Sequence, residues 1–230
     1  MRPLVLLVSA LGCADITPLE DGARYGPVTV VQDWFTSFSV IRTGTGTVLV
    51  DAGFREQTVT EGLAGHGIDA ASIDTVLLTH AHGDHVSGRA AVPQAELWGI
   101  GSEAELLGES TDGATLDRAL TAGEVLAFGG TRVEVLSVPG HTRGSAAYLV
   151  DGVLLLGDAC LVDGDGRVAL VPEKRSEDPH QAAVSLAGLA RQLEARGVRV
   201  DWLVPSHSGA ARGLGPLLDF ASRVEAGDAG

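Results

Sequence analysis

Three histidines and an aspartate lie within six consecutive residues of the segment LLTHAHGDHVSG, residues 77–88. The segment begins with an apolar run that predicts the end of a buried strand. Side chains two residues apart in an extended chain point the same way, so His80 and His82 can converge on one ion. Asp84 and His85 lie beyond the following glycine and can face a second ion. Imidazole nitrogen and carboxylate oxygen suit zinc, manganese or iron better than calcium, so the segment predicts a metal site.

Four further polar residues follow apolar runs elsewhere in the chain. Asp51 ends VLVD, His141 follows VLSVPG, Asp158 ends LLLGD and His207 follows WLVPS. Each apolar run predicts a buried strand, and the ends of strands are where loops hold functional groups on a rigid frame. We therefore expect these residues to share one site with the histidine-rich segment.

The elements that must position these residues alternate between strands and helices. β-Branched runs indicate strands, 3.6-residue spacing indicates helices, and Gly, Pro or Asp mark their ends. The pair Asp151-Gly152 predicts a tight hairpin turn, and Asp178 followed by Pro179 predicts the start of the clearest helix. The predicted strands cover 28–33, 38–50 with a turn at 43–46, 72–80, 96–99, 124–140, 145–158 and 198–205, and the predicted helices cover 55–67, 112–120, 178–197 and a segment after 213.

The motifs HAHGDH, PGHTRGS, LLLGD, VPSHSG and the upstream VLVDAG together resemble the metallo-beta-lactamase fold superfamily of metal-dependent hydrolases. They occur in the expected order from about residue 48 to residue 209, and the resemblance is nearest to the glyoxalase II-like members. It implies an α+β fold, a four-layered αββα sandwich in which two mixed sheets are flanked by helices and the ions lie at one edge.

The resemblance also implies the ligands. The first metal ion would be held by His80, His82 and His141, the second by Asp84, His85 and His207, with Asp158 bridging both and Asp51 supporting the ligand loop. Two Zn²⁺ ions per chain are expected, with iron or manganese as alternatives. A metal-bound hydroxide would cleave an ester, thioester, lactone or amide bond of a small molecule, and Asp84 would accept or relay its proton.

Two other functions remain open at this stage. A mononuclear iron oxidoreductase resembling the persulfide dioxygenases would bind one iron through His80, His141 and Asp158. A non-catalytic relative is disfavoured, because all seven ligand positions are filled. The best-known two-zinc lactamases have a cysteine where this chain has Asp158, which weakens an antibiotic-hydrolysing function.

Several conspicuous residues are expected to lie outside the chemistry. Cys160 is interpreted as a small buried hydrophobe rather than a thiolate ligand. His66 and His180 are isolated histidines at helix ends and need no function. Arg143 replaces the proline of many relatives and either clamps an anionic substrate group or pairs with surface acids.

Composition limits the partners. The 230 residues carry a formal net charge of −14, which disfavours nucleic acid and anionic lipid surfaces and leaves a small-molecule substrate. No apolar run reaches the roughly 18–20 residues that span a bilayer. The two cysteines are too few for a disulfide framework.

The amino terminus resembles a short bacterial lipoprotein signal. Residues 1–13 contain a basic residue, an apolar run and a small residue before Cys13, which would carry a lipid anchor. Residues 14–230 then form a single domain, located in the bacterial cell envelope or periplasm. The alternative is a first buried strand in a cytoplasmic protein. The oligomeric state is not predicted.

Overall fold

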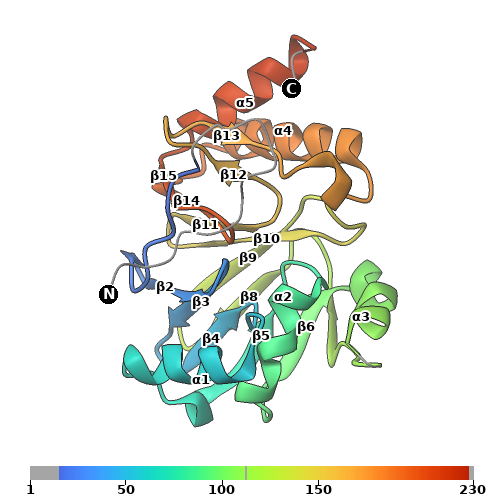
Figure 1. The fold of residues 1–230 in the computed structure, drawn as a ribbon. Coiled ribbons are helices and arrows are strands. Elements are labelled where there is room, and N and C mark those ends of the chain that lie inside the picture. Colours follow the sequence, from blue (N-terminus) through green and yellow to red (C-terminus); the bar gives the residue numbers. More distant parts are fainter. Residues whose placement is uncertain (1–15, 112, 228–230) are drawn as a thin grey trace.

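Two β-sheets pack face to face in the computed structural model, and helices cover both outer faces (Figure 1). The predicted α+β fold, a four-layered αββα sandwich, is confirmed. The structure describes residues 16–111 and 113–227. The signal predicted at residues 1–13 lies outside the described residues and stays a prediction.

The first sheet contains seven strands, and their order in the sheet follows the chain. Strands β1 to β4 are antiparallel to their neighbours, whereas β4 to β7 run parallel to one another. Valine, isoleucine and threonine are frequent in them, which favours the extended backbone. The strands are β1 Arg24–Tyr25, β2 Val28–Asp33, β3 Thr36–Arg42, β4 Thr47–Val50, β5 Ile73–Leu77, β6 Glu96–Ile100 and β7 Arg118–Leu120.

The second sheet contains six strands in the order β15, β14, β11, β10, β9, β8. Only β11 and β14 pair in parallel. The Asp151-Gly152 turn joins β10 to β11 as predicted. The strands are β8 Val125–Phe128, β9 Thr131–Ser137, β10 Ala146–Val150, β11 Val153–Gly157, β14 Trp202–Pro205 and β15 Ala211–Arg212, and a separate two-stranded ribbon consists of β12 Leu161–Val162 and β13 Val168–Ala169.

The helices divide between the two outer faces. Figure 1 shows α4 and α5 together over the second sheet, with α1 and α3 on the side of the first. The predicted cap of α4 is present, because the Asp178 side chain accepts a hydrogen bond from Gln181 N at 2.8 Å. The α-helices are α1 Glu56–Gly65, α2 Gly83–Val86, α3 Ala104–Ser110, α4 Pro179–Ala195 and α5 Gly215–Glu225, and the 3₁₀ helices are η1 Ala70–Ser72, η2 Ser87–Ala91, η3 Gly101–Glu103 and η4 Glu173–Arg175.

Three apolar layers separate the four structural layers. Side chains alternate across each strand, so Val30 packs between the sheets while the next residue, Val31, packs against α1. Leu155 likewise packs between the sheets, and Leu154 packs toward α4 and α5. The central strands β4, β10 and β11 are therefore buried on both faces, which explains why they read as continuous apolar runs.

The helix predicted over 112–120 is wrong. The helix of this region lies earlier, in α3, where Leu107 is fully buried against the first sheet. Residues Arg118–Leu120 instead form β7 at the edge of that sheet and pair in parallel with β6. Asp117 fixes this pairing, since its carboxylate accepts a hydrogen bond from Leu97 N at 2.8 Å. Pairing at the sheet edge outweighs the weak local helical spacing.

No helix among residues 16–111 and 113–227 is both long enough and apolar enough to cross a bilayer.

Candidate metal centre

Five strands end at one edge of the sandwich, and each is followed by a predicted site residue. In the first sheet, β4 and β5 are parallel. In the second, β9 and β11 are both antiparallel to β10, and β14 is parallel to β11. Within each sheet these carboxyl ends therefore lie on the same side, and residues that follow them in the two sheets come together in one cluster. The residues that follow these ends are Asp51, His80, His141, Asp158 and His207.

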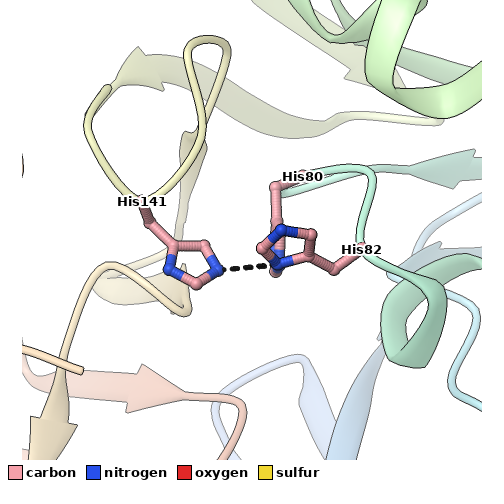
Figure 2. A group of neighbouring side chains, drawn as sticks. All are labelled: His80, His82 and His141. Atoms are coloured by element: carbon pink, nitrogen blue, oxygen red, sulfur yellow. Dashed lines mark hydrogen bonds between the residues drawn. The ribbon is translucent and has the colours of Figure 1, made fainter. Parts of the chain in front are cut away.

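His80, His82 and His141, which we term the three-histidine group, point ring nitrogens at one another (Figure 2). His80 Nε2 lies 3.1 Å from His82 Nδ1, and His141 Nε2 lies 3.2 and 3.0 Å from these two atoms. His80 Nδ1 lies 3.1 Å from Thr79 Oγ1, so the other ring nitrogen of His80 already has a partner. The first predicted ligand set is brought together.

Asp84, His85 and His207, termed the second group, also converge. His207 Nε2 lies 3.2 Å from Asp84 Oδ2, and His85 Nε2 lies 3.9 Å from the same oxygen. Asp84 and His85 belong to the four-residue helix α2, which begins directly after His82. The hydrogen bond from Ala52 N to His85 O, 2.7 Å, fixes α2 beside the end of β4.

Asp158 lies between the two groups. Its Oδ2 is 3.5 Å from His141 Nε2 and 3.2 Å from His207 Nε2, and its Oδ1 is 3.2 Å from His85 Nε2. Gly157 permits this position: its φ is +53°, and a Cβ there would lie 2.5 Å from Thr79 Oγ1. Asp158 and the two groups together form the seven-donor cluster.

Asp51 supports the cluster through three hydrogen bonds. Its carboxylate accepts from Thr79 N and Thr79 Oγ1, both at 2.8 Å, and lies 2.7 Å from His85 Nδ1. Because a carboxylate can only accept, His85 donates its Nδ1 proton to Asp51 and turns Nε2 toward the cluster. The role that the family resemblance implies for Asp51 has a direct structural basis.

Burial keeps the three-histidine group neutral. It lowers the pKa of His82, lowers that of His80 well below its usual value, and lowers that of His141 to about 4. At neutral pH each of the three imidazoles therefore has a lone pair available, and a cation can bind without displacing a proton.

The carboxylates have the opposite effect on the second group. Although burial lowers it, the pKa of His85 rises well above its usual value because Asp158 and Asp51 are close, and Asp158 likewise raises the pKa of His207 to about 9. Burial raises the pKa values of Asp158 and Asp84, but the nearby His207 and His85 outweigh it. The pKa of Asp158 is held well below its usual value, and that of Asp84 is lowered. Both histidines are therefore protonated at neutral pH as long as no cation is bound, and a cation that binds to the second group displaces those protons.

Metal ions fit this donor set. His85 Nε2 and Asp158 Oδ1 are buried and lie 3.2 Å apart, yet neither forms a hydrogen bond, although a buried polar atom normally has a partner. A tetrahedral zinc ion with Zn–N bonds of about 2.0–2.1 Å separates its ligand nitrogens by about 3.3 Å. The three-histidine group, with separations of 3.0–3.2 Å, is close to that spacing.

Sequence reasoning missed one buried carboxylate, Glu103. It is fully buried at the end of η3 and accepts hydrogen bonds from Ala81 N, Thr142 Oγ1 and Gly144 N. Nothing local distinguishes Glu103 from the exposed Glu105 two residues later.

An aromatic shelf, made of the exposed Trp34 and Phe35 and the partly buried Phe54, borders the cluster. The Trp34 ring is 5.1 Å from Phe35 and 6.1 Å from Phe54 between centroids, and Trp34 is 60% exposed. Phe35 stacks on the His207 imidazole at 5.7 Å, and its carbonyl oxygen lies 3.0 Å from His207 Nδ1. Arg55 lies over the Trp34 ring at 4.3 Å. A molecule bound at the cluster would contact this shelf.

The residues expected to lie outside the chemistry have structural environments of their own. Cys160 is fully buried, and burial raises the pKa of its thiol to about 12. His66 pairs with Asp21 at 3.0 Å, and His180 is exposed at the start of α4. Arg143 forms ion pairs with surface acids, Glu105 at 2.8 Å and Glu177 at 3.5 Å.

Comparison with known proteins places the chain among its relatives. The profile of the metallo-beta-lactamase superfamily matches residues 31–207. A hydroxyacylglutathione hydrolase of Anaeromyxobacter dehalogenans (strain 2CP-C) is 33% identical over 207 residues, covering 89% of this chain and 69% of that protein. Another from Acidiphilium cryptum (strain JF-5) is 34% identical over 142 residues, covering 53% of this chain and 56% of that protein.

The chain spans about half the length of several such relatives, 56%, 52% and 43% in three cases. A solved structure of a subclass B3 metallo-beta-lactamase of Bradyrhizobium japonicum superposes with a TM-score of 0.68 at 20% identity, covering 92% of this chain and 93% of that one. Similarity at this level of identity shows a shared fold.

Proposed function

We propose that this chain, which belongs to the metallo-beta-lactamase superfamily, uses its seven-donor cluster to hydrolyse an ester, thioester, lactone or amide bond of a small molecule. The superfamily profile and the hydroxyacylglutathione hydrolase relatives confirm the family and the hydrolase class. The substrate and the identity and number of the metal ions are the proposed part. A small acyl thioester is the first candidate, because two relatives are named for a glutathione thioester.

The observation that carries the proposal is the convergence of the three-histidine group. Three ring nitrogens within 3.0–3.2 Å of one another, on imidazoles that burial keeps neutral, would direct lone pairs at one point. Such an arrangement is unfavourable unless a cation binds there.

The second group favours two ions over one. The single-iron alternative uses His80, His141 and Asp158 and leaves His85 without a role. His85 Nε2 is nevertheless buried, without a hydrogen bond and directed at the cluster by Asp51. A second ion held by Asp84, His85 and His207 would give this nitrogen a partner. We therefore propose two divalent ions, with zinc suited to the imidazole-rich donor set.

The chain's own residues divide the remaining work. When bound, such ions polarise the substrate carbonyl and make water a nucleophile at neutral pH. Asp84 is 20% exposed, and its lowered pKa keeps it a carboxylate that can take a proton from attacking water. The aromatic shelf excludes water on one side and offers apolar contact to an acyl or leaving group.

Two measurements test the proposal. Metal analysis of protein purified without added metal should find two zinc ions per chain, whereas one iron together with oxygen consumption would favour the dioxygenase-like alternative. Purified protein should then be screened against a thioester, a lactone, nitrocefin and a phosphodiester. We expect hydrolysis of the thioester or the lactone that a chelator abolishes and added Zn²⁺ restores. Full activity after exhaustive metal removal would refute a metal-dependent mechanism.

A further inference from the structure

One buried carboxylate outside the seven-donor cluster joins the two loops that carry the three-histidine group. Glu103 Oε2 accepts a hydrogen bond of 2.8 Å from Ala81 N, on the residue between His80 and His82. Its Oε1 accepts bonds of 2.6 Å from Thr142 Oγ1 and 2.7 Å from Gly144 N, on the loop that begins with His141. A single side chain therefore spans the gap between the two loops.

This contact is tightly packed as well as hydrogen-bonded. A Cβ on Gly144 would lie 2.7 Å from Glu103 Cγ and 2.8 Å from Glu103 N, so the loop can approach only because residue 144 is glycine. Thr142 is held in turn by Ser145, whose Oγ lies 2.8 Å from Thr142 Oγ1 and accepts a bond from Thr142 N at 3.0 Å. The loop after His141 is thus fixed against Glu103 at several atoms.

Burying a carboxylate at this position costs free energy of desolvation. Glu103 has 0% exposure, and among the described residues it forms no ion pair with lysine or arginine. Three neutral donors compensate for its burial, and each of them belongs to one of the two histidine loops. An apolar side chain of similar size would fill the same space without this cost, but it could not fix the separation of the loops.

We propose that Glu103 is a positioning residue that sets the distance between the loop of His80 and His82 and the loop of His141. It thereby sets the metal affinity of the three-histidine group. The second group does not depend on it, because His85 is held by Asp51. The inference rests on the proposed function, since it presupposes that the cluster binds metal.

Glu103→Gln is the sharpest perturbation because it changes shape very little. A glutamine amide has one oxygen, whereas the carboxylate accepts at both positions. In either orientation the amide nitrogen of the variant opposes a backbone N–H, that of Ala81 or that of Gly144. One of the two loops is therefore released while the packing is conserved.

The experiment measures Co²⁺ affinity, by competition with a chromophoric chelator, in two backgrounds. His207→Ala leaves only the three-histidine group complete, and His82→Ala leaves only the second group complete. Glu103→Gln should weaken Co²⁺ binding by about 10–100-fold in the first background and leave it unchanged in the second. The visible spectrum of bound Co²⁺ should change only in the first. Glu109→Gln, at an exposed position on α3, is the matched control and should change neither.

The outcomes distinguish the positioning role of Glu103 from the proposed function of the cluster. Unchanged affinity of Glu103→Gln in the His207→Ala background, or equal weakening in both backgrounds, overturns the positioning role. Absence of Co²⁺ binding by the parent protein overturns the proposed function and this inference with it. If circular dichroism shows that Glu103→Gln does not fold, Thr142→Val replaces it, since it removes one bond to Glu103. Loss of affinity confined to the first background supports the proposal, and unchanged affinity again overturns it.

Discussion

Replacing Asp51 with asparagine should switch the proton of His85 to the wrong nitrogen. In the native protein the Asp51 carboxylate lies 2.7 Å from His85 Nδ1 and accepts two further bonds from Thr79. The asparagine amide can keep its oxygen toward Thr79 N, and its NH₂ group then faces His85 Nδ1. That arrangement favours the tautomer protonated at Nε2, which has no lone pair to offer a metal ion.

The magnitude follows from the bonds that change. A hydrogen bond to a charged group contributes about 1.5–3 kcal/mol, and the substitution removes the charged acceptor that His85 Nδ1 contacts. Replacing a residue that orients a ligand typically costs about 10–100-fold in metal affinity, which corresponds to about 1.4–2.8 kcal/mol. The two ranges agree. We therefore expect the metal affinity of the second group to fall by one to two orders of magnitude.

Chelator competition with Zn²⁺ in the His82→Ala background measures this affinity directly. Asp74→Asn, an exposed position on β5, is the control for the substitution itself. If Asp51→Asn bound Zn²⁺ as tightly as the parent, the orienting role assigned to Asp51 would be wrong. A larger loss at the three-histidine group, measured in the His207→Ala background, would equally contradict the reasoning, because only His85 is in direct contact with Asp51 among the histidines.

Three further outcomes are expected. His82→Ala should lose one metal ion per chain and nearly all turnover by metal analysis and steady-state kinetics, whereas His66→Ala should lose neither; equal effects would contradict the site assignment. Trp34→Asn, chosen because asparagine tolerates the positive φ of 60°, should raise KM several-fold for thioesters with bulky apolar acyl groups without lowering kcat, and an unchanged KM would remove the shelf from substrate binding. A thiol reagent at pH 8 should leave Cys160 unmodified until denaturant is added, as peptide mass spectrometry would show, because burial raises its pKa to about 12; rapid labelling of the folded protein would contradict that burial.

The family resemblance implies the sandwich, and the apolar runs of the sequence locate its central strands. Continuous apolar runs mark β11 and β14, and a polar residue directly after each run marks its end. The spacing of His80 and His82 also follows from local geometry alone. The metal-ligand roles themselves rest on the family resemblance and on the convergence of the donors, and they stay predictions until a metal is bound and measured.

Contacts between distant segments explain what the sequence does not predict. The hydrogen bonds of Glu103 reach partners 22, 39 and 41 residues away in the chain. Helix α3 and strand β7 are likewise decided by packing against the first sheet and by pairing at its edge, not by local spacing. The aromatic shelf requires Phe35 to meet His207, which is 172 residues away.

The two buried carboxylates constrain the cluster in different ways, and this separates metal binding from substrate choice. Asp51 contacts an imidazole and decides where its proton resides, whereas Glu103 contacts backbone and decides how far apart two loops lie. Neither touches the aromatic shelf, which is carried by the turn between β2 and β3 and the segment before α1. Phe35 is the exception because it stacks on His207, so we expect substitutions of Trp34 in particular to change substrate choice while the donor geometry stays fixed. That independence is what allows one metal-binding frame to serve hydrolases of different substrates.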